Sequence, residues 1–141
     1  MPLNRLDHVN LRTANLQVLQ DFYVEVLGMQ LGARPPFAFG GAWLYSGGYP
    51  TVHLVEVPAQ PAPKGELRLE HFAFAAEGLG DFLATLKRHG VAYRIGVVPG
   101  FDIIQVNVND PDGNHIHIDF APAEAAQAPG EPALERLLST A

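Results

Sequence analysis

The chain has 141 residues with 48% hydrophobic and 17% charged content, a composition typical of a globular protein of one domain or two fused modules. Its net charge is −6 and no run of Lys or Arg occurs, which argues against a nucleic-acid partner. The absence of cysteine excludes disulfides and thiolate ligands, so a bound metal must use His, carboxylate or amide groups. We expect a cytoplasmic protein with no membrane partner, because no signal-peptide pattern opens the chain and no apolar run approaches the roughly 20 residues that cross a bilayer.

The first half of the chain predicts one strand, one helix and three further strands. Alternating apolar and polar residues indicate a strand over 5–12. Capping candidates at 13–15 precede a helix over 16–27, whose apolar stripe ends at Gly28. Three short strands follow, at residues 29–34, 42–46 and 51–57.

The second half predicts the same elements in the same order. A strand over 68–75 is followed by an amphipathic helix over 79–89 that ends at Gly90. Three strands follow, at residues 91–95, 103–108 and 115–120. The tight turn at 110–114 joins the last two strands, because Asp, Pro, Gly and Asn favour turns.

The chain is therefore an internal repeat. We predict an α+β fold in which two βαβββ modules, at about 3–57 and 67–121, form a curled mixed sheet around a cavity within one domain, 1–121. Residues 58–66 contain three prolines and are predicted to link the modules. Residues 122–141 are predicted to form an Ala/Pro-rich C-terminal tail that is mobile over 122–132. A short helix is expected at 133–139, packed on this subunit or on a neighbouring one.

Two histidines recur at matching places in the two repeats. His8 stands near the start of the first strand, and His71 stands at the same place in the second repeat. His53 follows His8 by 45 residues, and His117 follows His71 by 46. This match indicates four imidazoles that converge on one metal ion. The alternative interpretation is a set of strand histidines that are bonded to the backbone or exposed to solvent.

Side-chain alternation separates an apolar face of the strands from a polar one. The face predicted to lie under the helices carries Val9, Leu11, Val52, Leu54, Phe72, Phe74, Ile116 and Ile118. The polar face carries the four histidines together with Asn10, Arg12, Gln105, His115 and Asp119. We expect Asn10, Arg12 and Gln105 to contact a substrate. His115 shares this face as a spare ligand or as a surface residue, and we favour the surface interpretation. Alternation sends Glu56 and Glu70 to the side opposite the histidines.

Several motifs resemble the vicinal oxygen chelate superfamily. The closing strand–turn–strand at 106–117, with its Asp-Pro-Asp-Gly turn, is the most specific of them. The Asp-His-Val start at 7–9 and the helix end at 22–28 are also characteristic of this superfamily. The resemblance covers roughly residues 3–121. It implies a glyoxalase-like fold, a homodimer and a small-molecule partner.

The resemblance also implies a metal set. Carried over from the superfamily, the ligands of a divalent ion (Zn, Ni, Fe, Mn or Co) are His8, His53, His71 and His117. The chain departs from the pattern at His117, where catalytic members generally have a glutamate. Proton transfer next to a carbonyl needs a base beside the metal, so His117 or Asp119 must act in place of that glutamate.

Three kinds of function remain open. The first is a metal-dependent lyase, isomerase or dioxygenase that binds a substrate with two vicinal oxygens at the histidines. The second is a metal-free drug-binding protein of the bleomycin-resistance type, with Trp43, Tyr45 and Tyr49 lining its pocket. The third is an accessory domain with a vestigial site.

Overall fold

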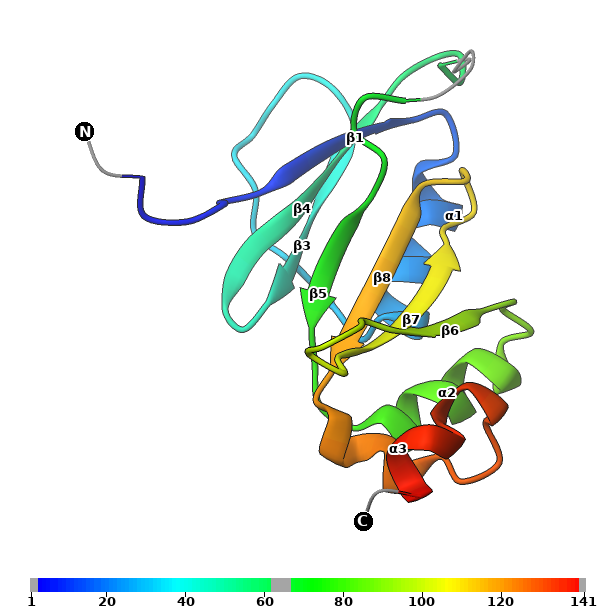
Figure 1. Cartoon of the computed structure of the whole chain (residues 1–141). Helices are drawn as coiled ribbons and strands as arrows, with labels where there is room; N and C mark the ends of the chain where they lie inside the picture. Colours follow the sequence, from blue (N-terminus) through cyan, green and yellow to red (C-terminus); the bar gives the residue numbers. More distant parts are fainter. Residues whose placement is uncertain (1–2, 62–66, 140–141) are drawn as a thin grey trace. The chain divides into compact units, whose positions relative to one another are not determined.

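The computed structural model describes residues 3–61 and 67–139 and divides the chain into two compact units, Met1–Gly65 and Glu66–Ala141. Each unit contains one four-stranded mixed sheet, so the α+β class and the two βαβββ modules predicted from the sequence are confirmed. Residues 62–66, which make up most of the predicted linker, lie outside the described residues. Figure 1 shows the elements of both units.

Unit 1 contains the first βαβββ module. Its elements are β1 (Val9–Thr13), α1 (Leu16–Asp21), the π-helix η1 (Phe22–Val26), β2 (Gln30–Gly32), β3 (Gly41–Ser46) and β4 (Tyr49–Glu56). The sheet has the order β1-β4-β3-β2. The first strand runs parallel to the last, and the other neighbours are antiparallel. The parallel pairing brings the first and last strands of the module side by side.

The helix predicted over 16–27 is present, but it changes from an α-helix to a π-helix along its length. It is α-helical to Asp21 and then continues as a π-helix to Val26. Leu19, Phe22 and Tyr23 on the predicted stripe are buried. The helix ends where Gly28 adopts a φ of 75°, a left-handed conformation that glycine takes without steric cost.

Unit 2 repeats the module. Its elements are β5 (Phe72–Ala75), α2 (Leu79–Arg88), β6 (Arg94–Val97), β7 (Ile104–Asn109) and β8 (His115–Phe120). The sheet has the order β5-β8-β7-β6, again with the first strand parallel to the last. On the apolar face of the last strand Ile116 and Ile118 are buried, as Val52 and Leu54 are in unit 1. These residues form the cores predicted from alternation, whereas Phe72 and Phe74 are half-buried.

Besides β1, which begins at Val9 rather than at residue 5, two strands of unit 2 begin three or four residues later than predicted. β5 begins at Phe72 rather than at residue 68, so Glu70 and His71 precede the strand. β6 begins at Arg94 rather than at residue 91. The second delay has a local cause, because the amide of Val91 donates to the carbonyl of Leu86 at 2.9 Å and so completes the C-terminal cap of α2.

The C-terminal segment is ordered and packed, which corrects the prediction of a mobile tail. It contains η2 (Pro122–Gln127), η3 (Pro132–Leu134) and α3 (Glu135–Ser139), and the last two cover the predicted short helix. Leu134 is fully buried, and η2 packs against α2 (Figure 1). A composition rich in Ala and Pro hid this packing because the few large apolar side chains come at the end of the segment.

Within the described residues, every helix is too short or too polar to cross a bilayer.

Candidate metal centre

Strand register places the predicted histidines at equivalent positions in the two units. Asn10 of β1 pairs with His53 of β4, and Ala73 of β5 pairs with His117 of β8. His8 and His71 each stand two residues before the first member of these pairs. Each unit therefore brings together the histidine before its first strand and the histidine on its last strand.

In unit 1 the two imidazoles are stacked. The rings of His8 and His53 have centroids 3.9 Å apart, and Trp43 stacks on His53 at the same distance. His53 donates from Nε2 to the carbonyl oxygen of Pro50 at 2.9 Å, and His8 donates from Nδ1 to Asp7 at 2.7 Å. Burial lowers the pKa of His53, so its ring favours the neutral form that binds metals.

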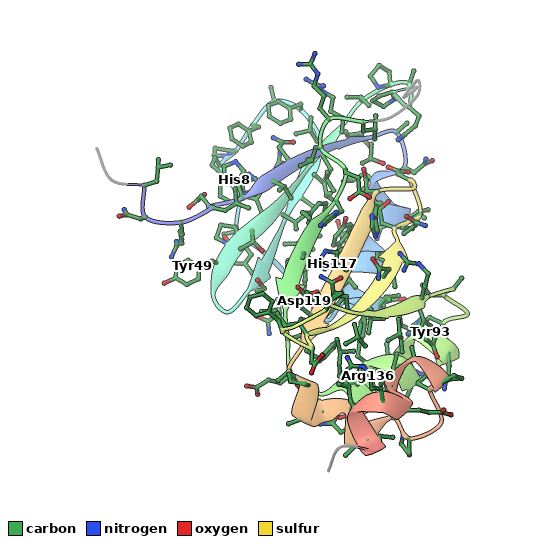
Figure 2. The ribbon with its side chains drawn as sticks, viewed as in Figure 1. His8, Tyr49, Tyr93, His117, Asp119 and Arg136 are labelled. Atoms are coloured by element: carbon green, nitrogen blue, oxygen red, sulfur yellow. The ribbon has the colours of Figure 1, made fainter. Side chains whose placement is uncertain are left out.

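In unit 2 the corresponding rings are close but tilted. The centroids of His71 and His117 lie 4.3 Å apart. His117 is buried and donates from Nδ1 to Asp119 at 2.6 Å, so the two residues predicted to be catalytic are in direct contact (Figure 2). A carboxylate on Nδ1 fixes the tautomer and orientation of the imidazole and directs Nε2 toward a ligand.

Glu70 lies among the histidines of unit 2, and the prediction that it points away from them is wrong. Its carboxylate contacts Nδ1 of His71 with one oxygen and Nδ1 of His115 with the other, the second contact at 3.1 Å. Alternation failed here because Glu70 precedes β5 and its backbone is not pleated. The hydrogen bond from His71 is the main cause that lowers the pKa of Glu70, so the group is ionised at neutral pH.

His115 is the second residue that sequence reasoning undervalued. It begins β8 and is only half-buried, but both its ring nitrogens have protein partners. Nε2 lies 2.8 Å from Oδ1 of Asn107, and Nδ1 faces Glu70. Glu70, His71 and His115 each offer one ligand atom within 4.8 Å of the others. The His-x-His spacing of His115 and His117 was the available signal, since alternate residues of a strand share a face.

Two of the three residues predicted to contact substrate lie close to the candidate site. Asn10 is in register with His53, and Gln105 of β7 is in register with Asp119. Arg12 lies two residues beyond Asn10 on the same exposed side of β1. The structure therefore brings Asn10 and Gln105 next to the site, and it leaves Arg12 at the opposite end of the strand from His8.

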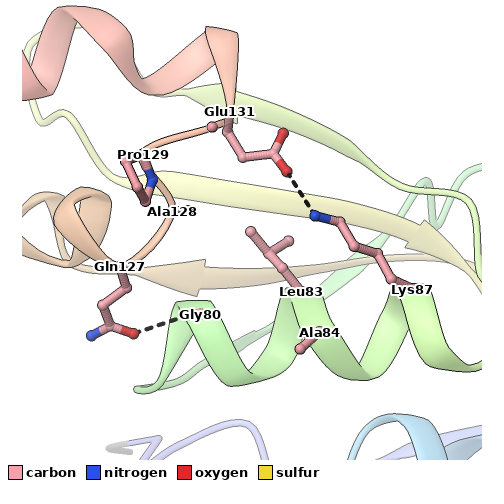
Figure 3. A pocket seen from close by; sticks show the side chains of 9 residues that line it. Gly80, Leu83, Ala84, Lys87, Gln127, Ala128, Pro129 and Glu131 are labelled. Atoms are coloured by element: carbon pink, nitrogen blue, oxygen red, sulfur yellow. Dashed lines mark hydrogen bonds and ion pairs between the residues drawn. The ribbon is translucent and has the colours of Figure 1, made fainter.

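Two hollows are present in unit 2. A groove of about 490 Å³ adjoins the histidine cluster and is lined by Ala92, Tyr93, Arg94, Asn107, Val108, Asn109 and His115. A smaller pocket of about 300 Å³ lies between α2 and the C-terminal segment. Figure 3 shows Lys87 and Glu131 paired across this pocket at 3.8 Å, together with apolar Leu83 and Ala84. The smaller pocket contains none of the predicted site residues, whereas the groove includes His115 of the histidine cluster.

The donor set fits a divalent transition metal. Neutral imidazoles and a carboxylate are the ligands that Zn, Fe, Co and Ni prefer in the absence of thiolates. Each of the four predicted ligands, His8, His53, His71 and His117, has a protein acceptor at one ring nitrogen, which is the support that metal-binding histidines usually have.

The chain matches the family model of the Glyoxalase/Bleomycin resistance protein/Dioxygenase superfamily over residues 5–118. This match covers most of the sequence, and the chain belongs to that superfamily. The resemblance inferred from the motifs is thereby confirmed. No curated protein matches the chain significantly.

Solved structures show the same fold. The glyoxylase/bleomycin resistance protein/dioxygenase domain from Frankia sp. EAN1pec aligns with a TM-score of 0.71 and 21% identity, over 85% of this chain and 99% of its own. A putative glyoxalase family protein from Bacillus anthracis gives 0.69 and 22%, over 86% and 98%. Lactoylglutathione lyase from Agrobacterium tumefaciens gives 0.63 and 16%, over 84% and 95%. The superfamily thus includes enzymes, and at these identities the likeness shows the fold alone.

Proposed function

We propose that the chain is a metal-dependent enzyme that acts on a small molecule with two vicinal oxygens. The predicted ligands of its divalent ion are His8, His53, His71 and His117. The observation that carries this proposal is the repeated pairing, in which each unit places the histidine before its first strand against the histidine on its last. Two unrelated strand histidines would have no reason to recur in the same register twice.

Residues of both units would supply the remaining chemistry. When bound, the divalent ion would polarise an oxygen of the substrate as a Lewis acid. Asp119 holds the proton on Nδ1 of His117 and leaves Nε2 as a lone pair that either binds the ion or accepts a substrate proton. Gln105, in register with Asp119, and Asn10, in register with His53, would donate hydrogen bonds to substrate oxygens. The proposed reaction is that of a lyase, an isomerase or a dioxygenase.

Metal content tests the proposal. Protein purified without chelator should contain a divalent metal in stoichiometric amount, and apo-protein should take up Zn, Ni, Co, Mn or Fe(II) on titration. Absence of metal together with no uptake would overturn the proposal. Oxygen-sensitive iron in the purified protein would assign a dioxygenase, whereas stable zinc or nickel would assign a lyase or isomerase.

We further propose that the protein acts as a cytoplasmic homodimer, as implied by its superfamily resemblance. Sedimentation equilibrium of the purified chain should give twice the monomer mass. A mass equal to that of one chain would remove the dimer from the proposal without affecting the metal.

A second candidate function rests on unit 1. His53 is stacked between His8 and Trp43 and donates a hydrogen bond to the carbonyl oxygen of Pro50. These contacts can stabilise the ring of His53 in a protein that binds no metal. A metal-free binder of aromatic drugs would use the Trp43 face of this stack. Thermal shifts caused by such compounds and unchanged by chelator or added metal would favour this candidate.

A further inference from the structure

We propose that unit 2 binds the divalent ion through Glu70, His71 and His115. This inference rests on the proposed function for the presence of a metal, but it assigns two ligands outside the expected four-histidine set. It supplies from Glu70 the carboxylate that the chain lacks at the position of His117.

The ligand atoms of the cluster lie somewhat farther apart than those around a bound ion, so the side chains would have to move slightly closer together to bind one. One ligand atom from each of the three residues lies within 4.8 Å of the others. Ligand atoms on a tetrahedral zinc ion, with bonds of about 2.0–2.1 Å, lie roughly 3.4 Å apart. The side chains of Glu70 and His71 are 66% and 40% exposed, so both can rotate by this amount without disturbing the core.

Hydrogen bonding around Asn107 determines which nitrogen of His115 carries a proton. The amide nitrogen of Asn107 lies 3.3 Å from the carbonyl oxygens of both Arg94 and Gln105 and donates to them. The amide oxygen of Asn107 therefore faces Nε2 of His115, 2.8 Å away, and accepts a hydrogen bond from the N–H group at that position.

The other nitrogen of His115 then presents a lone pair to a carboxylate. In the neutral ring, Nδ1 is an acceptor, and it lies 3.1 Å from Oε1 of Glu70, which is also an acceptor. Two acceptors at this distance repel unless either a second ring proton on Nδ1 or a metal cation lies between them. A His ring that donates its far N–H to an amide oxygen while its near nitrogen faces an anionic oxygen is the arrangement found at protein metal sites.

The resulting donor set is chemically distinct from four imidazoles. Two histidines and one carboxylate reduce the net positive charge at the ion and suit Zn, Fe(II), Mn and Co. The groove of about 490 Å³ that includes His115 gives a small ligand access to the remaining coordination positions.

The test compares metal binding by variants of the full-length protein. Apo-protein is titrated with Co(II), and the Kd and the visible absorption band are measured for wild type, Glu70→Gln and His115→Gln. We expect the Kd to rise more than about tenfold in both variants, because even residues that only support a ligand cost about 10–100-fold. Glu77→Gln and His89→Gln, exposed positions in the same unit, serve as matched controls and should bind like wild type.

The outcomes separate this inference from the function on which it rests. If wild type binds no metal, the proposed function fails and the inference fails with it. If wild type binds Co(II) and Glu70→Gln and His115→Gln bind equally well, the inference is overturned while the metal-dependent function stands. Loss of binding in His8→Gln and His53→Gln alone would then assign the ion to the expected set. Glu70→Asp keeps the carboxylate and should retain most of the affinity, which excludes a general folding defect in Glu70→Gln.

Discussion

The contact between His117 and Asp119 joins two residues that the sequence placed on one face of one strand. Alternation alone predicted that both would point the same way, and their hydrogen bond of 2.6 Å follows from that geometry. The same rule failed for Glu70, because it holds only within a pleated strand and the sequence does not mark where β5 begins. The predictable part of the site is therefore the part that lies inside the strands.

Asp119→Asn should weaken metal binding without unfolding the protein. The amide oxygen still accepts from Nδ1 of His117, but it is uncharged and makes Nε2 a less basic ligand than a carboxylate does, so we expect the Kd for Zn to rise about 10–100-fold. Isothermal titration of apo-protein with Zn measures the change. Asp81→Asn, on the exposed surface of α2, is the control. An unchanged Kd for Asp119→Asn would mean that the pair only stabilises β8.

The phenol of Tyr93 should resist ionisation. Burial, together with its hydrogen bond to Glu131 at 2.7 Å, raises the pKa of Tyr93 to about 12 from the ordinary value of 10.0. The unfolded chain releases this proton from about pH 10, whereas the folded chain keeps it until about pH 12, so the contribution of Tyr93 to stability is lost as the pH rises through this window.

The measurement is the phenolate absorption of wild type minus that of Tyr93→Phe, followed through alkaline pH. The difference spectrum should titrate well above the ordinary tyrosine value of 10.0. A midpoint at that ordinary value would contradict the burial of Tyr93.

Helix α2 is capped by residues far away in the sequence. Its N-cap, Gly78, has no side chain to offer, and Oε1 of Glu124 accepts from the amides of Gly78 and Leu79 at 2.7 and 3.2 Å. Gln127 accepts from the amide of Gly80 at 2.9 Å (Figure 3). The amphipathic stripe and Gly90 made the helix predictable, but a cap supplied from about 45 residues downstream leaves no local signal.

Glu124→Ala should destabilise unit 2 by about 1–2 kcal/mol, since it removes a cap and a negative charge from the positive end of the helix dipole. Glu124→Gln keeps an acceptor oxygen and should cost less. Urea unfolding monitored by circular dichroism gives both values. Glu25→Ala, an exposed carboxylate in unit 1, should change the free energy of unfolding by less than about 0.5 kcal/mol. If Glu124→Ala matched this control, the cap would contribute nothing.

The molecule consists of two units with the same strand order, and in each unit the first strand pairs in parallel with the last. This architecture could be predicted because the repeat sets both the order and the type of the elements. The placement of the C-terminal segment could not, because its packing depends on single apolar residues such as Leu134 among many alanines and prolines.

Leu134→Ala should therefore destabilise the protein far more than a surface truncation. Leu134 is fully buried, and removing a buried leucine costs about 2–5 kcal/mol. Leu69→Ala, at a residue of the same unit that is 62% exposed, should cost less than about 0.5 kcal/mol. Chemical denaturation of the two variants provides the comparison, and similar midpoints would show that the C-terminal segment is not part of the folded core.

The distant cap on α2 has a consequence for synthesis of the chain. The last strand of unit 1 ends at Glu56. All strands of its sheet are therefore synthesised before those of unit 2, and the sheet can form while the ribosome is still translating unit 2. Unit 2 must wait, because Glu124 and Gln127 follow the start of α2 by about 45 residues, roughly 2–9 seconds at ~5–20 residues per second. During that interval the first amides of α2 lack the acceptors that cap them in the folded protein, whereas every strand of the first sheet has already been made.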